Sequence, residues 1–238
     1  MNKHFTILTA QLVFAIGLGN LAAQQSRPVF VSEPAAERIA NLDLLKKEVR
    51  EYHDCTCKCG CYTHDVDLEA DRAIAYLRKR VAHRGPNEKL ALILDIDETT
   101  LSNYVEETGA DFAYKPDVFD LWVQSAQAAA IPGTLRLYQE AQKLGVSIFF
   151  ISGRTENERA ATERNLRAQG FDKWKLLVMW PVAHGNQTVG RFKAVTRAEI
   201  AAQGYTLALN VGDQWSDLKG KPEAEYSVKY PDPFYFVP

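Results

Sequence analysis

Two groups of residues in this chain have the types and spacing to do chemistry. One is a set of carboxylates: Asp95 and Asp97 end the run KLALILDID, and Asp213 and Asp217 lie in GDQWSD. The other group, in HDCTCKCGCYTHD, holds every cysteine of the chain at alternate positions: Cys55, Cys57, Cys59 and Cys61. Carboxylate oxygens suit a hard cation such as Mg²⁺, whereas cysteines form disulfides or bind soft metals. The elements that position these residues indicate which group does the main chemistry.

Four apolar runs predict β-strands that are buried on both faces. They cover residues 89–97, 146–152, 175–180 and 205–213. Helical spacing of apolar residues predicts helices over 134–144, with Thr134 as N-cap, and over 156–169. Two earlier helices are expected over 35–51 and 66–81, joined by the cysteine cluster. Strands that alternate with helices predict an α/β fold, with a parallel sheet flanked by helices.

Polar residues follow three of the predicted strands. Asp95 and Asp97 end the first, Ser152 ends the second, and Asp213 ends the last. Because ligands of open parallel sheets bind beyond the carboxyl ends of the strands, we expect these side chains at one edge. Several carboxylates in a small space repel one another unless a cation lies between them, so the pattern predicts a magnesium site. Such a cation attracts a phosphate group.

The order of these motifs resembles that of the haloacid dehalogenase (HAD) superfamily of phosphotransferases. Its DxDx[TV] signature is matched by DIDET at residues 95–99, its serine or threonine motif by Ser152, and its lysine motif by Lys193. Its fourth motif is matched by Asp213 and Asp217. The likeness implies a Rossmann-like HAD fold with a small helical cap.

A closer likeness concerns the acid phosphatases grouped with the class B type, in HAD subfamily IIIB, which include plant vegetative storage proteins. The segments LDIDETTLSN and VGDQWSDL are similar to theirs, and the likeness extends from about Leu45 to the C-terminus. It implies hydrolysis of small phosphate monoesters. The rival hypotheses are a catalytically inactive phosphate-binding or storage relative, and a metal or redox protein centred on the cysteines.

The HAD resemblance also implies catalytic roles. Asp95 is expected to attack phosphorus and form an aspartyl-phosphate, and Asp97 to act as general acid and then general base. Protonation of Asp97 at the moment of departure implies an acidic pH optimum. Ser152 and Lys193 are expected to bind the phosphoryl oxygens.

Metal and substrate ligands follow from the same likeness. Mg²⁺ is expected to be held by the carboxylates of Asp95 and Asp213 and by the backbone carbonyl of Asp97, with Asp217 in support. Besides Ser152 and Lys193, the substrate-binding set includes Gly153, Arg154, Tyr104 and Phe112.

Three of these assignments depend on local context. Arg154 either binds phosphate or pairs with a carboxylate such as Asp97 or Glu156. Tyr104 and Phe112 belong to an aromatic-rich segment, residues 103–131, which we call the cap segment. Aromatic rings there either stack on an aryl or nucleoside leaving group or simply pack the cap segment onto the core. Arg197, one helical turn after Lys193, is expected to form a structural salt bridge.

The N-terminus resembles an export signal. Lys3 precedes an apolar run of about fifteen residues, FTILTAQLVFAIGLG, which is too short to span a bilayer, and cleavage is expected near Ala23. We therefore expect a periplasmic or secreted protein without a membrane anchor after cleavage. The formal charge of -2 gives no basic excess to neutralise a nucleic acid backbone, so a nucleic acid polymer is not an expected partner. The expected organisation is a signal peptide (1–23), an extended arm (24–34), an N-terminal helical extension (35–88) and a core (89–238) that includes the cap segment.

The cysteine cluster has two main interpretations, disulfides and a metal site, and free thiols are a third. In an oxidising compartment, cysteines tend to form disulfides, and Cys55–Cys59 with Cys57–Cys61, or a nested set with Cys55–Cys61, is less strained than i to i+2 closure. The alternative is a zinc or copper site that uses His53 or His64 as extra ligands. The relatives that the chain resembles usually have a short polar link here, so the cluster is not part of their chemistry.

Overall fold

The computed structural model describes residues 39–57, 61–183 and 185–237. The chain divides into two units, Met1–Ile39 and Ala40–Pro238, and the described residues lie almost entirely in the second. The predicted signal peptide and arm lie outside the described residues. Within the described part of the chain, no helix has both the length and the apolar character needed to cross a bilayer.

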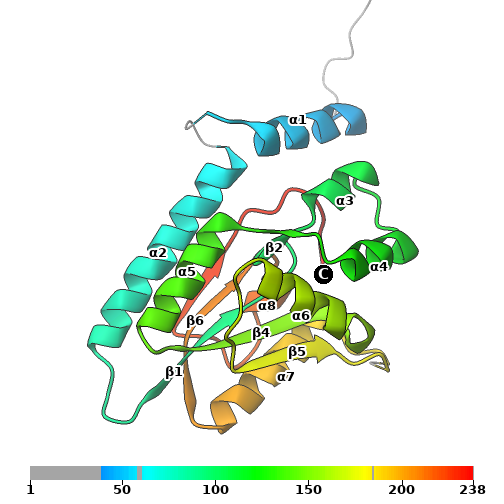
Figure 1. The fold of residues 1–238 in the computed structure, drawn as a ribbon. Helices are drawn as coiled ribbons and strands as arrows, with labels where there is room; N and C mark the ends of the chain where they lie inside the picture. The colour runs from blue at the N-terminus through cyan, green and yellow to red at the C-terminus, as the bar shows by residue number, and fades with distance from the viewer. Residues whose placement is uncertain (1–38, 58–60, 184, 238) are drawn as a thin grey trace, which may run out of the picture. The chain divides into compact units, whose positions relative to one another are not determined.

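A parallel sheet of five strands forms the centre of the second unit (Figure 1). Its strands pair in parallel, which confirms the predicted α/β fold with a parallel sheet. The central strand is β1 (Lys89–Leu94), and the two strands beside it, like β1, end in candidate site residues. The order across the sheet is β5 (Leu176–Trp180), β4 (Ser147–Thr155), β1, β6 (Tyr205–Gly212) and β7 (Tyr226–Lys229).

Helices cover both faces of this sheet, as the alternation along β1 requires. Leu90, Leu92 and Leu94 belong to the larger core, which includes residues of α2 (Tyr62–Ala82), α5 (Pro132–Lys143) and α6 (Arg159–Ala168). Ala91 and Ile93 belong to the second core, which includes Phe192 and Ile200 of α7 (Val189–Ala202). Because the strand is apolar on both faces, only its end can offer polar groups.

The cap segment lies between β1 and α5 in the chain. It contains α3 (Tyr104–Gly109) and α4 (Pro116–Ser125), and a short ribbon of β2 (Leu101–Ser102) and β3 (Ala129–Ala130) closes its base. The remaining described elements are α1 (Leu42–Asp54), a 3₁₀ turn (Glu156–Glu158) and α8 (Trp215–Leu218).

The structure corrects the predicted start of one helix. α5 begins at Pro132 with Ile131 as N-cap, because proline is well suited to the first helical position. Thr134 is therefore inside the helix and is not its cap. Its buried hydroxyl instead donates to the backbone oxygen of Thr99, at 2.5 Å, and so connects α5 to the turn that follows β1.

The contact between α5 and α2 depends on Gly133. A Cβ atom at this position would lie 2.9 Å from the Cβ of Ala70 and 3.1 Å from Oδ1 of Asp67. The two helices therefore approach one another more closely than a larger residue allows.

We expect Gly133→Ala to lower the free energy of unfolding by about 1–3 kcal/mol through overpacking, measured by urea denaturation. Gly109→Ala is the matched control, because a Cβ at Gly109 meets no heavy atom within 4 Å. Equal stability of the two variants would contradict the tight contact between α2 and α5.

Candidate active site

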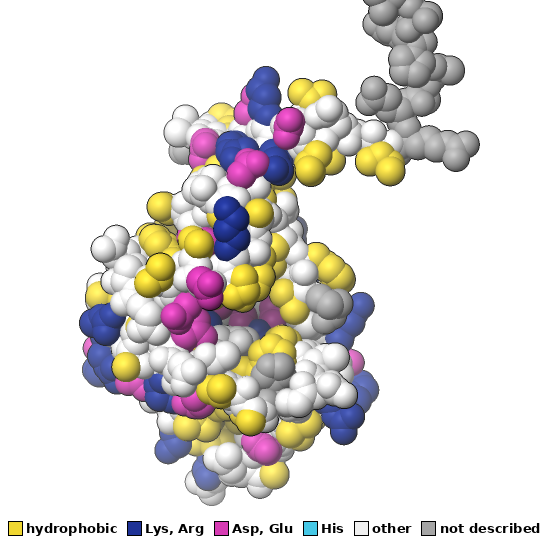
Figure 2. Space-filling view, turned by 90° about the vertical axis from the view of Figure 1, so that its right-hand side faces the viewer, with side chains coloured by type: hydrophobic (Ala, Val, Ile, Leu, Met, Phe, Trp, Pro, Cys, Tyr) yellow, Lys and Arg dark blue, Asp and Glu magenta, His cyan; other side chains and the backbone are white. Residues whose placement is uncertain are grey.

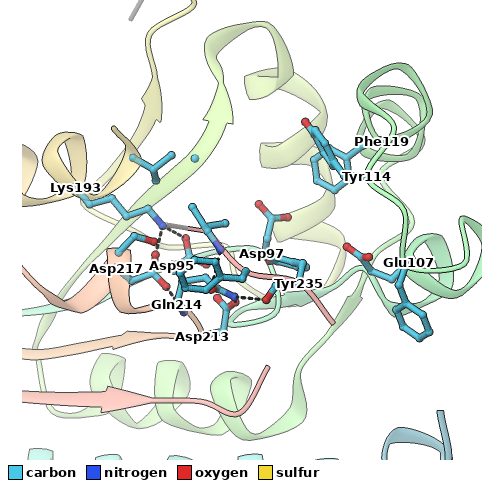
Figure 3. A pocket seen from close by; sticks show the side chains of 16 residues that line it. Asp95, Asp97, Glu107, Tyr114, Phe119, Lys193, Asp213, Gln214, Asp217 and Tyr235 are labelled. Atoms are coloured by element: carbon cyan, nitrogen blue, oxygen red, sulfur yellow. Dashed lines mark hydrogen bonds and ion pairs between the residues drawn. The ribbon is translucent and has the colours of Figure 1, made fainter. Parts of the chain in front are cut away.

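A pocket of about 350 Å³ opens at the carboxyl ends of β1, β4 and β6 (Figure 3). Its floor is charged, with Asp95, Lys193, Asp213 and Asp217, and much of its wall is aromatic. In the space-filling view, acidic and basic side chains lie at the bottom of a hollow whose rim carries both hydrophobic and acidic side chains (Figure 2). The sheet edge predicted from the sequence is thus the edge that carries the pocket.

Three buried carboxylates form the floor. One oxygen atom from each of Asp95, Asp213 and Asp217 lies within 4.8 Å of the others. Asp95 directly follows β1, and its backbone N–H donates to the carbonyl of Val211 in β6, at 3.1 Å. Asp213 follows β6 and Asp217 belongs to α8, so two adjacent strands and a short helix assemble the group. We call these three residues the carboxylate cluster.

Lys193 of α7 neutralises part of the carboxylate cluster. Its ammonium nitrogen donates to Oδ1 of Asp217 at 2.5 Å and also to Oδ1 of Asp95. All three of these side chains are almost completely buried. Asp213 accepts from two neutral groups, Thr99 Oγ1 at 3.0 Å and Gln214 Nε2 at 2.8 Å, and its carboxyl group also contacts that of Asp232.

Burial controls the proton affinity of these groups. It raises the pKa of Asp95 to about 7, although Lys193 opposes the rise, and it raises the pKa of Asp213 well above its ordinary value. Burial alone would lower the pKa of Lys193, but Asp217 and Asp95 outweigh it and the net shift is upward. One ammonium faces three carboxylates, and hard oxygen donors in surplus fit a divalent cation such as Mg²⁺.

Asp97 lines the pocket beside the carboxylate cluster, and Arg154 pairs with it. Arg154 Nη2 lies 2.7 Å from Oδ1 of Asp97, and the arginine side chain is only 1% exposed. Of the two roles left open by the sequence, the structure supports the ion pair with Asp97. Arg154 is not among the residues that line the pocket, whereas its neighbour Gly153 is.

Two other predicted contacts differ from expectation. Ser152 is buried at the end of β4, where its Oγ accepts from the backbone N–H of Arg154 at 3.0 Å, and it does not line the pocket. Tyr104 is also absent from the lining, because its ring stacks on His53 with centroids 3.3 Å apart. Tyr104 thus packs against α1 and its contact with substrate stays a prediction, whereas Phe112 does line the pocket.

Part of the pocket wall could not be assigned from the sequence. Gln214 fixes the C-terminal residues there: its Oε1 accepts from the N–H of Val237 at 3.2 Å, and its Nε2 donates to Oδ2 of Asp232 at 2.5 Å. The segment YPDPFYF is rich in aromatics and prolines, but no local pattern directs it to this site. Tyr114 and Phe119 belong to the aromatic cap segment, whose rings the sequence already offers for stacking on a leaving group. The lining residues missed by sequence reasoning are Glu107, Val189, Gln214, Ser216, Tyr235, Phe236 and Val237.

Arg197 supports the site from behind and does not form the expected salt bridge. Its fully buried guanidinium donates to four backbone carbonyl oxygens. One of them, at 2.6 Å, belongs to Asp217. Arg197 thus fixes the loop after α8 and holds Asp217 in the carboxylate cluster. The other three acceptors belong to Lys219, Gly220 and Pro222.

The cysteine cluster is separate from the pocket, whose lining contains no described cysteine. Cys55 and Cys61 carry free thiols, so both predicted disulfide sets, which use these two residues, are wrong. The sulfur atoms of Cys55, Cys57 and Cys61 lie within 4.8 Å of one another, and no described histidine belongs to this group. Cys59 lies outside the described residues.

Comparisons with known proteins agree with this geometry. A family model described as HAD superfamily, subfamily IIIB (acid phosphatase) matches residues 20–238. Acid phosphatase 1 of Solanum lycopersicum is 34% identical over 179 residues, 74% of this chain and 69% of that protein. The stem 28 kDa glycoprotein of Glycine max is 33% identical over 181 residues, 74% and 70% of the two chains. The class C acid phosphatase of Bacillus anthracis has the same fold, with a TM-score of 0.68 at 22% identity over 82% of this chain and 86% of that chain.

Glu107 brings a further carboxylate to the pocket, from the cap segment. It is 9% exposed, and burial, followed by repulsion from Glu106, Asp232 and Asp97, raises its pKa to about 7. A carboxyl group with a raised pKa in the folded state binds its proton more tightly there than in the unfolded chain. Stability therefore decreases as the pH rises from about 4.5 to about 7.

We expect Glu107→Gln to remove this pH dependence. At about pH 8 the variant should be more stable than the original chain by about 1–2 kcal/mol, after allowance for solvent screening, and the gain should be much smaller at about pH 5. Urea denaturation at both pH values measures it. Glu48→Gln, on the exposed side of α1, should leave the pH dependence unchanged. If Glu107→Gln raised the free energy of unfolding by the same amount at both pH values, the raised pKa of Glu107 would be contradicted.

Proposed function

Since the chain belongs to the acid phosphatases of HAD subfamily IIIB and is therefore a phosphomonoesterase, we propose that Asp95 is its nucleophile. One carboxylate oxygen of Asp95 attacks phosphorus, the ester oxygen departs, and water then hydrolyses the aspartyl-phosphate. The observation that carries this proposal is the position of Asp95: a buried carboxylate at the end of the central strand, on the floor of the pocket and ion-paired with Lys193. Lys193 can then neutralise the charge that develops on the phosphoryl oxygens.

Asp97 is the proposed general acid and base. It gives a proton to the ester oxygen as the bond to phosphorus breaks, and it later accepts a proton from the attacking water. Its position in the pocket wall beside Asp95, with Arg154 fixing the carboxylate, supports this role. Ser152, buried behind the wall, is the proposed donor to the transferring group once phosphate is bound.

Mg²⁺ is the proposed cofactor. Asp95, Asp213 and Asp217, with the backbone carbonyl of Asp97, would hold it, and their hard oxygen atoms suit this ion. When bound, it supplies positive charge that offsets the repulsion between an anionic nucleophile and an anionic phosphate. The surplus of negative charge around Lys193 supports this assignment.

The proposed substrates are phosphate monoesters with an aryl or nucleoside leaving group. A flat, largely apolar group of this kind suits a wall that is built mostly from aromatic rings. The cap segment contributes the rings of Phe112, Tyr114 and Phe119. The C-terminal residues contribute those of Tyr235 and Phe236.

We also propose that the mature protein is exported to the periplasm or outside the cell. The support is the charged and apolar N-terminal sequence, together with a relative from Glycine max that is named a glycoprotein. A catalytically inactive storage protein is the less favoured function. Such a protein has no need to keep a buried ammonium among three carboxylates, because this arrangement carries a desolvation cost.

Asp95→Asn tests the nucleophile. We expect turnover of 4-nitrophenyl phosphate to decrease by about 10³-fold or more, because an amide cannot form the acyl-phosphate. Asp172→Asn, at an exposed position outside the pocket lining, is the control and should keep full activity. Near-normal turnover of a folded Asp95→Asn protein would show that another group attacks phosphorus.

Mg²⁺ binding can be tested separately from turnover. A ligand that binds only the folded state at about 100 times its Kd stabilises the protein by about 2.7 kcal/mol. We therefore expect Mg²⁺ to raise the Tm of chelator-treated protein and to restore its activity. Asp213→Asn should lose most of the Tm increase, whereas Asp172→Asn should keep it. An unchanged Mg²⁺ response in Asp213→Asn would remove Asp213 from the ligand set.

A further inference from the structure

The carboxylate of Asp97 is held almost entirely through one of its two oxygens. Oδ1 accepts three hydrogen bonds: from Arg154 Nε at 2.9 Å, from Arg154 Nη2 at 2.7 Å and from Asn103 Nδ2 at 2.7 Å. Oδ2 has one longer contact, 3.2 Å, with Arg154 Nε. A carboxylate oxygen has room for about two acceptor sites, so Oδ1 is saturated. Oδ2 is the oxygen left to serve substrate.

The amide of Asn103 can adopt only one orientation in this network. Nδ2 faces two carboxylates, Asp97 at 2.7 Å and Glu98 at 2.9 Å. Oδ1 faces two donors, Trp122 Nε1 at 2.8 Å and Arg154 Nη2 at 3.4 Å. Exchange of the amide oxygen and nitrogen would set donors against donors and acceptors against acceptors. Asn103 is only 1% exposed, so water cannot substitute for these partners.

Trp122 brings this network into the cap segment. It lies on α4, and Phe119, three residues earlier on the same helix, lines the pocket. Residues three apart share one side of a helix. α4 therefore contributes Phe119 to the pocket wall and Trp122 to the hydrogen-bond network that holds Asp97. Arg154, in contrast, has a second anchor in the core, because its Nη1 donates to the buried Thr162 of α6 at 3.1 Å.

We propose that Asn103 and Trp122 are positioning residues for the acid and base Asp97. Trp122 fixes the amide of Asn103, Asn103 and Arg154 hold Oδ1 of Asp97, and Oδ2 is thereby directed to the ester oxygen. The proposal rests on the proposed function of Asp97. It adds that the cap segment, through α4, sets the geometry of proton transfer as well as forming a wall of the pocket.

The test compares two esters that differ mainly in their need for a proton. 4-Nitrophenoxide is a stable leaving group without protonation, whereas phenoxide is far more basic and depends on the general acid. For Trp122→Phe, which keeps an aromatic ring but loses the indole N–H donor and part of the ring system, we expect kcat/KM to decrease about tenfold with phenyl phosphate and about twofold with 4-nitrophenyl phosphate. Asn103→Ser should lower the ratio of kcat/KM for phenyl phosphate to kcat/KM for 4-nitrophenyl phosphate still further.

Two reference variants complete the experiment. Asp97→Asn shows how the loss of proton donation changes the ratio of kcat/KM for phenyl phosphate to kcat/KM for 4-nitrophenyl phosphate. Trp174→Phe, which removes an indole that packs against Phe150 away from the pocket, should leave both rates unchanged. Circular dichroism and Tm measurements identify any variant that fails to fold, and the Trp122→Phe result then stands without Asn103→Ser.

The outcomes separate the two proposals. Equal decreases with both esters in folded Trp122→Phe and Asn103→Ser, while Asp97→Asn shows a marked preference for 4-nitrophenyl phosphate, would overturn the positioning role alone. No ester preference in Asp97→Asn would overturn the role of Asp97 and, with it, this inference. A graded loss of phenyl phosphate hydrolysis in Trp122→Phe, Asn103→Ser and Asp97→Asn supports it.

Discussion

The burial of three carboxylates around a single ammonium is the constraint on which the site depends. Asp95, Asp213 and Asp217 are each almost inaccessible to water, and Lys193 balances only part of their charge. Such an arrangement lowers the stability of the folded chain unless the surrounding structure holds every partner in place. The fold does this from several directions, since the carboxylates follow two central strands and α8, while the lysine comes from the helix on the second face.

Arg197 shows how far this support extends. A buried guanidinium is costly to desolvate, and here its donors are used on backbone carbonyls, including that of Asp217. The residue stabilises a loop whose role is to keep a carboxylate among other carboxylates. Gly212 contributes in the opposite way, by having no side chain: a Cβ there would overlap with the side chain of Asp217. The position of Asp217 therefore depends both on the hydrogen bond from Arg197 and on the absence of a side chain at Gly212.

The sequence was sufficient for the sheet and for the residues at its edge, because both depend on local patterns. Continuous apolar runs identified β1, β4, β5 and β6, and the polar residues at their ends identified the floor of the pocket. The ion pair of Arg154 with Asp97 joins residues 57 positions apart in the chain and was only one of two alternatives. The aromatic wall, the role of Asn103 and the path of the C-terminal segment depend on contacts between distant segments, which no local pattern encodes. The cysteine pairing could not be predicted for a different reason, because four cysteines at alternate positions allow several pairings that spacing alone does not separate.

The raised pKa of Asp95 has a consequence for metal affinity. A carboxylate must lose its proton before it can bind a cation, so protons and Mg²⁺ compete for the same oxygens. Burial raises the pKa of Asp95 to about 7, so this carboxylate takes up a proton at a higher pH than an ordinary aspartate does. With Asp95 as a Mg²⁺ ligand, as proposed above, the apparent affinity for Mg²⁺ decreases with decreasing pH. On that proposal, the acid limit of activity depends on the concentration of available Mg²⁺ as well as on the chemistry of the ester.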